Sequence, residues 1–141
     1  MIAYVDSSVL LRVVLAQPDR LPEWPTIQHA VTSALTEVEC LRTLDRRLRQ
    51  GLLDPEDLAD RRGLVLRLLE RMDRVDVSPA VLRRAADPFP TPLATLDAIH
   101  LATAILWREG RSEAPVLVTH DGQLATAARA TGFATAGALG A

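Results

Sequence analysis

The sequence Ile2-Ala3-Tyr4-Val5-Asp6-Ser7-Ser8 joins four apolar residues directly to an acid and two hydroxyl residues. A short, uninterrupted apolar run of this kind is typical of a strand that is covered on both faces. Asp6 or Ser7 can then act as the N-cap of a helix that runs from Ser7 to Leu15. This stretch therefore predicts a buried β-strand that passes at once into an α-helix.

The same alternation of strand and helix continues along the chain. Further strands are expected at residues 27–32, 75–77, 114–119 and 133–136, and further helices at residues 36–50, 55–73, 79–86, 95–108 and 123–130. Residues 16–26 and 87–92 contain several prolines each and are predicted to be loops within one domain. The pattern predicts a single α/β domain over residues 1–141, with a mostly parallel sheet of about five strands sandwiched between helices.

Composition excludes several classes of protein. The 141 residues are 48% hydrophobic, which is enough for a core, and the net charge of −2 does not suggest a cationic nucleic-acid binder. The first residues lack the pattern of a secretory signal, and no apolar run is long enough for a membrane span. One cysteine, Cys40, cannot form an internal disulfide. These features favour a cytoplasmic protein with no membrane association.

Four acidic residues fall where strands are predicted to end or helices to begin: Asp6, Glu39, Asp97 and Asp121. Parallel sheets bind ligands at the carboxyl ends of their strands. Each acid except Asp97 also has an ordinary explanation, because Asp6 and Asp121 could cap helices and Glu39 could complete a capping box with Thr36. Asp97 is harder to explain in this way, since its helix is apolar on nearly every face and a buried charge is costly without a partner.

Carboxylates that lie close together repel one another and raise each other's pKa, and a divalent cation removes that penalty. Mg²⁺ or Mn²⁺ suits a shell made only of oxygen ligands, water and substrate phosphate. We therefore expect a metal site in which Asp6 and Asp97 are ligands and Glu39 and Asp121 bind directly or through water. Such a site predicts hydrolysis of phosphate esters.

Other polar residues can support this site. Thr119 and Ser7 neighbour the candidate ligands and could donate hydrogen bonds to a carboxylate. His100 lies one helical turn after Asp97, and a histidine in the core or behind the ligands is the more usual interpretation. Cys40 is interpreted as a small buried residue.

Helix geometry does not choose between Glu37 and Glu39, which are about 200° apart on an ideal helix. Three arginines follow the Glu39 side of that helix: Arg42, Arg46 and Arg49. They could track a phosphate backbone, or they could form a solvated face with local ion pairs. Both alternatives stay open at this point.

Four segments resemble the PIN-domain ribonucleases, and in particular the VapC-type toxins of bacterial toxin–antitoxin pairs. They are Tyr4-Val5-Asp6-Ser7-Ser8-Val9-Leu10-Leu11-Arg12, Thr32-Ser33-Ala34-Leu35-Thr36-Glu37-Val38-Glu39, Leu96-Asp97-Ala98-Ile99-His100-Leu101-Ala102-Thr103-Ala104 and Val118-Thr119-His120-Asp121-Gly122-Gln123-Leu124. Each motif alone is weak, but the four occur in order over nearly the whole chain. His120 stands where the family often has an aromatic residue, and the acid at the fourth position varies in importance.

The resemblance implies a catalytic acidic site of Asp6, Glu39, Asp97 and Asp121, and it selects Glu39 over Glu37. It implies Thr119 as a supporting group and a Mg²⁺- or Mn²⁺-dependent endoribonuclease that acts on RNA. It also implies a homodimer and neutralisation by a cognate small antitoxin protein.

Competing functions are weakened by what the sequence lacks. All 16 basic residues counted as Lys or Arg are arginine, whereas phosphoacceptor domains and aspartate-nucleophile phosphatases normally need a lysine. Neither GxGxxG nor GxxxxGK[ST] is present. The remaining alternative is a non-catalytic PIN-like module that binds protein or RNA. An apolar stripe in the helix at residues 55–73 is expected to pack in the core, with a partner groove as the less favoured use.

Overall fold

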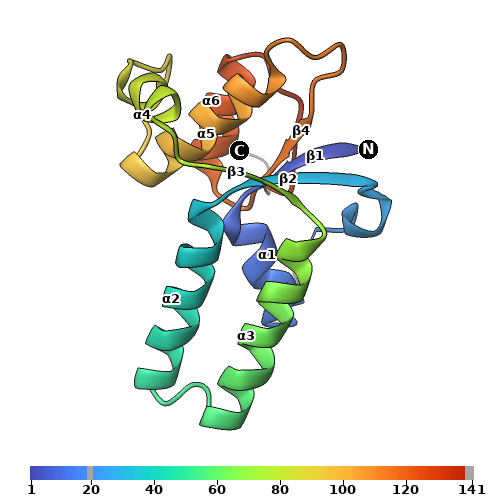
Figure 1. The fold of residues 1–141 in the computed structure, drawn as a ribbon, viewed down its shortest axis with the longest axis vertical. Coiled ribbons are helices and arrows are strands. Elements are labelled where there is room, and N and C mark those ends of the chain that lie inside the picture. The colour runs from blue at the N-terminus through green and yellow to red at the C-terminus, as the bar shows by residue number, and fades with distance from the viewer. Residues whose placement is uncertain (19–20, 139–141) are drawn as a thin grey trace.

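The computed structural model describes residues 1–18 and 21–138, and in this part of the chain five strands form one parallel sheet (Figure 1). The strands lie in the order β3-β2-β1-β4-β5, with these bounds: β1 Ile2–Val5, β2 His29–Ser33, β3 Asp73–Val75, β4 Val116–Val118 and β5 Thr135–Ala136. Every neighbouring pair is parallel, which confirms the predicted α/β class.

Helices connect the strands and cover both faces of the sheet (Figure 1). Their bounds are α1 Ser7–Val14, α2 Leu35–Arg49, α3 Pro55–Glu70, α4 Pro79–Ala86, α5 Thr95–Arg108 and α6 Gly122–Ala130, with a 3₁₀ turn, η1, at Trp24–Thr26. Successive residues of β1 are buried on opposite faces, since Tyr4 packs with Leu101 and Leu124, whereas Val5 packs with Val9. Coverage on both sides explains why the strand is uninterruptedly apolar.

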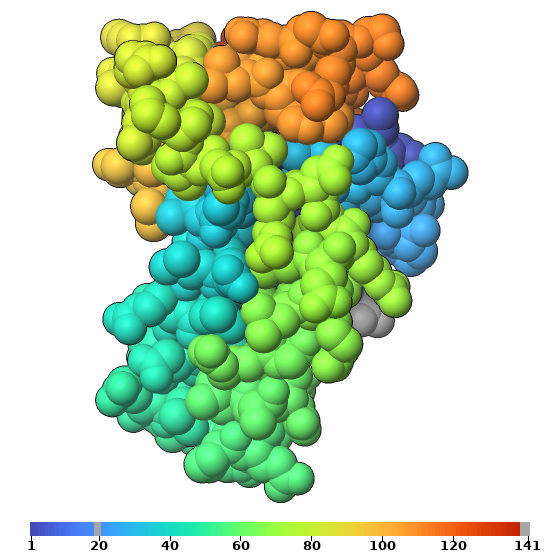
Figure 2. Space-filling model, viewed as in Figure 1, coloured from blue at the N-terminus to red at the C-terminus, as the bar shows by residue number. Residues whose placement is uncertain are grey.

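Helices α2 and α3 form an antiparallel arm that extends away from the sheet (Figures 1 and 2). Their apolar residues pack on one another and on α1, around Leu10, Cys40 and Leu44. The predicted apolar stripe of α3 belongs to this core: Leu58, Val65, Leu68, Leu69 and Met72. Core packing, the favoured use of that stripe, is therefore confirmed.

Several predicted boundaries were wrong by a few residues. α3 ends at Glu70 rather than Asp73, and β3 spans 73–75 rather than 75–77. β3 is an edge strand whose position is set by backbone pairing with β2, in the register Val31↔Asp73. Because an edge strand can carry exposed charged residues, its apolar content does not mark its bounds. In addition, the predicted loop over residues 16–26 contains η1.

The register of the sheet places the ends of two strands side by side. Val5 of β1 is paired with Val118 of β4, so the next residues, Asp6 and Thr119, leave the sheet together. The Asp6 amide also donates to the carbonyl of Val118 at 3.1 Å. Of the helices in the described residues, none is both long and apolar enough to cross a bilayer.

Candidate functional site

Asp6 lies at the carboxyl end of β1, where its buried carboxylate is held by three hydroxyl groups. Oδ2 accepts hydrogen bonds from Ser8 Oγ and Thr119 Oγ1, both at 2.7 Å, and Oδ1 accepts a longer one of 3.4 Å from Ser7 Oγ. Asp6 occupies the N-cap position of α1, yet its side chain makes no capping hydrogen bond. Helix capping therefore does not explain this carboxylate.

Backbone amides fix the two closer hydroxyl groups. The amide of His120 donates to Ser8 Oγ at 3.0 Å, and the amide of Asp121 donates to Thr119 Oγ1 at 2.9 Å. Each hydroxyl oxygen accepts from the backbone and donates its own hydrogen to Asp6, so the carboxylate has a fixed orientation. Thr119 lies where the sequence analysis expected it.

Ser8 was missed by the sequence analysis, which named Ser7. Ser7 does reach Asp6, but at 3.4 Å, whereas Ser8 makes the short bond. A serine two residues after an aspartate at a helix start is a signal for such a local contact. That signal alone is common and would not have separated Ser8 from Ser7.

His100 connects Asp6 to α2 from within the core. Its ring is fully buried on α5, with Nδ1 at 2.8 Å from the hydroxyl of Tyr4 and Nε2 at 2.5 Å from Oε1 of Glu39. Nε2 is also 3.6 Å from Oδ1 of Asp6. Burial lowers the pKa of His100, but the hydrogen bond to Glu39 and the neighbouring carboxylate charges outweigh it and raise the pKa. The interpretation as a histidine behind the acidic residues agrees with this position.

The two glutamates of α2 face different surroundings. Glu39 contacts His100, while Glu37 lies 3.8 Å from Arg74 of the edge strand β3. The capping box that could have explained Glu39 is not formed, because α2 begins at Leu35 with no side-chain cap. The hydroxyl of Thr36 instead bonds that of Thr32 at 2.7 Å. Of the two glutamates, Glu39 is the one adjacent to Asp6.

Asp97 lies in the first turn of α5, where its helix is capped by Ala94 without a side-chain hydrogen bond. Burial raises the pKa of Asp97 to about 6, and the charges of Asp121, Asp6 and Glu39 act in the same direction. His100 partly opposes the shift. All four acids are therefore close enough to interact electrostatically around Asp97.

Asp121 caps a helix, as the ordinary explanation of this residue predicted. It is the N-cap of α6, and its Oδ1 accepts a 2.9 Å hydrogen bond from the amide of Leu124. Its charge is nevertheless the strongest of the neighbouring charges that raise the pKa of Asp97. One carboxylate oxygen serves the helix, and the residue still adds negative charge to the site.

The donor set fits a hard divalent cation, because it consists of carboxylates. Burial and, after it, the charges of the other carboxylates raise the pKa of Asp97. Within residues 1–18 and 21–138, however, no three His, Cys, Asp or Glu side chains stand at the mutual spacing of ligands to one ion. Two side chains are turned to protein partners, Glu39 to His100 and Asp121 to the amide of Leu124. Each of these hydrogen bonds uses one of the two carboxylate oxygens.

The arginines on the Glu39 side of α2 form a solvated face with local ion pairs, which is the more ordinary of the two interpretations given above. Arg42 and Arg49 are exposed, and both lie near Asp45, at 4.0 and 3.0 Å. Hydrogen bonding and the charges of these arginines lower the pKa of Asp45. Arg46 is also exposed. The face is solvated and partly neutralised by local ion pairs.

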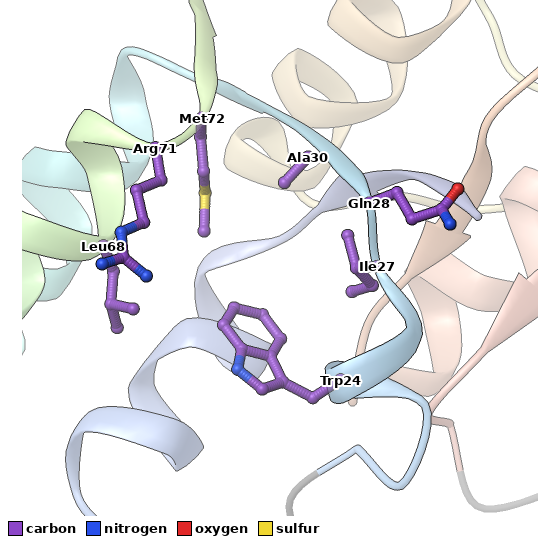
Figure 3. A pocket seen from close by; sticks show the side chains of 7 residues that line it. All are labelled: Trp24, Ile27, Gln28, Ala30, Leu68, Arg71 and Met72. Carbon is purple, nitrogen blue, oxygen red and sulfur yellow. The ribbon is translucent and has the colours of Figure 1, made fainter.

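A separate hollow of about 250 Å³ lies between η1, β2 and the end of α3 (Figure 3). Trp24 and Ile27 line one side and Leu68, Arg71 and Met72 the other. None of the four acids lines it. The acidic site and this hollow are thus separate features.

Comparison with known proteins identifies the family. The PIN domain model matches residues 3–130. Ribonuclease VapC35 of Mycobacterium tuberculosis is 39% identical over 139 residues, which cover 93% of each chain.

Two solved structures share the fold at low sequence identity. VapBC2 from Rickettsia felis, bound to a DNA fragment from its promoter, matches with a TM-score of 0.67 and 11% identity, over 96% of this chain and 97% of that one. A toxin–antitoxin complex from Klebsiella pneumoniae matches with a TM-score of 0.58 and 16% identity, over 87% and 89%. Together with the family model and the VapC35 match, these likenesses agree with the parallel sheet described above: the chain belongs to the PIN-domain family and is a relative of the VapC ribonucleases.

Proposed function

We propose that this protein is a Mg²⁺- or Mn²⁺-dependent endoribonuclease that acts as the toxin of a toxin–antitoxin pair. The observation that carries the proposal is the meeting of acidic side chains beyond the carboxyl end of β1, where Nε2 of His100 lies 2.5 Å from Glu39 and 3.6 Å from Asp6. The raised pKa of Asp97, caused first by burial and then by the charges of Asp121, Asp6 and Glu39, agrees with this arrangement. The similarity to a protein named as a ribonuclease supports RNA as the substrate.

In this proposal, Asp6 and Asp97 hold the ion, and Glu39 and Asp121 contribute directly or through water. When bound, the ion lowers the pKa of a water molecule and offsets negative charge on the phosphate. Ser8 and Thr119 keep the Asp6 carboxylate in one orientation, as their 2.7 Å hydrogen bonds favour. One of the carboxylates would also orient the attacking water and accept its proton, and we assign this role to Glu39.

The test compares purified wild type with Asp97→Asn, which nearly preserves side-chain shape but weakens metal binding. A panel of structured RNAs is incubated with each protein, with and without Mn²⁺. We expect Mn²⁺-dependent cleavage by the wild type and its loss in the variant. Equal cleavage by the two proteins would refute the proposed site, and RNA binding without cleavage by either would favour the non-catalytic module.

The toxin role has its own test. The Klebsiella pneumoniae structure is a toxin–antitoxin complex, and the Rickettsia felis structure is of VapBC2; both support a small antitoxin partner for this chain. We expect cytoplasmic expression of the wild type to arrest cell growth and expression of Asp97→Asn not to. Co-expression of a small neighbouring gene product should relieve the arrest. We also propose that the protein forms a homodimer, as the family resemblance implies, and light scattering tests this. Normal growth without any antitoxin would remove the toxin role and leave the nuclease proposal standing.

A further inference from the structure

We propose that His100 is a positioning residue that holds Glu39 in place through a hydrogen-bonded relay from Tyr4. The inference rests on the proposed function, since it assigns to Glu39 a role in ion binding and cleavage. It concerns three side chains from three different elements: Tyr4 on β1, His100 on α5 and Glu39 on α2.

Burial makes this relay rigid. The rings of Tyr4 and His100 are both 0% exposed, and their centroids are 6.0 Å apart in an edge-to-face arrangement. Tyr4 also packs among the apolar residues between the sheet and α5, including Leu101 and Leu117. A histidine enclosed in this way cannot turn its ring to water, so the partners of its two nitrogens are set by the fold.

The partners determine where the ring carries hydrogen. The Tyr4 hydroxyl lies 2.8 Å from Nδ1, where it can donate a hydrogen bond, and this leaves the ring hydrogen on Nε2. Nε2 then donates to Glu39 Oε1 at 2.5 Å. A protonated ring would also carry hydrogen on Nε2, so in both forms Nε2 is the donor that faces Glu39.

The position of the Glu39 side chain depends on His100. This side chain is 20% exposed, and it belongs to a helix that has few other contacts with the sheet. Without a fixed partner, such a side chain would sample several rotamers, and its carboxylate would not have one fixed position. A carboxylate held by one oxygen still presents the other to an ion or to water. Groups that hold metal-binding carboxylates or their neighbours in this way typically contribute about 10–100-fold in metal affinity or activity.

The variants separate a hydrogen-bonding role from simple packing. His100→Gln keeps an N–H group at about the position of Nε2, whereas His100→Leu fills similar space without a donor. Tyr4→Phe removes only the hydroxyl from the buried ring. His29→Gln is the matched control, because His29 is exposed at the amino end of β2, whereas Asp6 lies at the carboxyl end of β1.

The first measurement is Mn²⁺ binding by calorimetry on folded variants. We expect His100→Leu to bind Mn²⁺ about 10–100-fold more weakly, His100→Gln to recover most of that loss, and His29→Gln to bind as the wild type does. Cleavage should follow the same order in kcat, with KM for RNA little changed. Folded His100→Leu that binds Mn²⁺ like the wild type, or His100→Gln as impaired as His100→Leu, would overturn the proposal.

A second measurement needs neither metal nor RNA. Nitrogen-15 NMR of the imidazole should show hydrogen on Nε2 of His100 in the wild type, exchanging slowly with water. In Tyr4→Phe that hydrogen should exchange faster or move to Nδ1. An unprotonated Nε2 in the wild type would overturn the relay even if the His100 variants do not fold. A wild type that cleaves no RNA would refute the proposed function, whereas this NMR result would still decide the relay.

Discussion

The hydroxyl of Thr119 donates a 2.7 Å hydrogen bond to Asp6 although the two residues are 113 positions apart in the sequence. The contact exists because β1 and β4 are adjacent parallel strands that end in register, with Val5 opposite Val118. Both residues are buried, and the Thr119 hydroxyl also accepts from the amide of Asp121. Thr119 thereby joins two of the four acids in one hydrogen-bond network.

We predict that Thr119→Val lowers Mn²⁺-dependent cleavage by about 10–100-fold, because Val keeps the shape but removes the donor to Asp6. Thr119→Ser keeps the hydroxyl and should retain most activity. Single-turnover cleavage rates at saturating Mn²⁺ measure the effect, and Thr126→Val on the exposed face of α6 is the control. Wild-type rates in folded Thr119→Val would show that this hydrogen bond does not orient Asp6.

The two glutamates of α2 provide a matched pair. Glu39 contacts His100, whereas Glu37 lies 3.8 Å from the exposed Arg74. We expect Glu39→Gln to reduce cleavage by about 100-fold or more, beyond the usual effect of losing a group behind the ligands. Glu37→Gln should stay near wild type, since exposed ion pairs contribute little. The same cleavage assay on both variants measures the difference, and a larger loss in Glu37→Gln would reverse the assignment.

Much of the fold was predictable from the sequence, because β1 and β4 are short apolar runs and because α3, α4 and α6 begin with a capping residue or a proline. The edge strand β3 was misplaced because pairing with β2, and not apolar content, fixes residues 73–75. Helix geometry could not choose Glu39 over Glu37, and only the family resemblance did, since the residue that contacts Glu39 is His100, 61 positions away. Local helix geometry contains no information about that contact.

The hydroxyl residues that contact Asp6 were not equally predictable from the sequence. Thr119 could be expected, because it ends a strand beside Asp6 in a parallel sheet. Ser8 could not be separated from Ser7, since both follow the acid and only the turn into α1 decides which hydroxyl reaches Oδ2. Side-chain placement over one or two residues depends on backbone angles that composition does not specify.

Asp97→Asn should stabilise the metal-free protein while abolishing cleavage. The pKa of Asp97 is raised to about 6 in the folded chain, above its value of about 3.9 in an unfolded chain. Ionisation therefore opposes folding as the pH rises through about 6, and this penalty is absent below about pH 4. The variant should melt above the wild type at about pH 8, and the difference should vanish in acid.

Thermal melts with and without Mn²⁺ measure this effect. Added Mn²⁺ should raise the melting temperature of the wild type more than that of Asp97→Asn, because only binding to the folded state stabilises it. Asp87→Asn, at an exposed aspartate, is the control for loss of charge alone. A variant that melts below the wild type at every pH would show that the carboxylate is not under electrostatic strain.

Cys40 is expected to be unreactive in the folded protein. Its thiol is fully buried on α2, and burial, with the charges of Glu39 and Asp6, raises its pKa to about 12. The pKa of the thiol in the folded protein exceeds its value of about 8.5 in an unfolded chain, so the thiol stays neutral at neutral pH. Its contribution to the stability of the fold is complete below about pH 8.5 and is lost as the pH rises toward about 12. Only the thiolate reacts readily with disulfide reagents. At about pH 8, we predict that an aromatic disulfide reagent labels the native protein negligibly and the guanidinium-unfolded protein rapidly. Equal labelling rates in the two states would contradict the packing of α2 against α1 and α3.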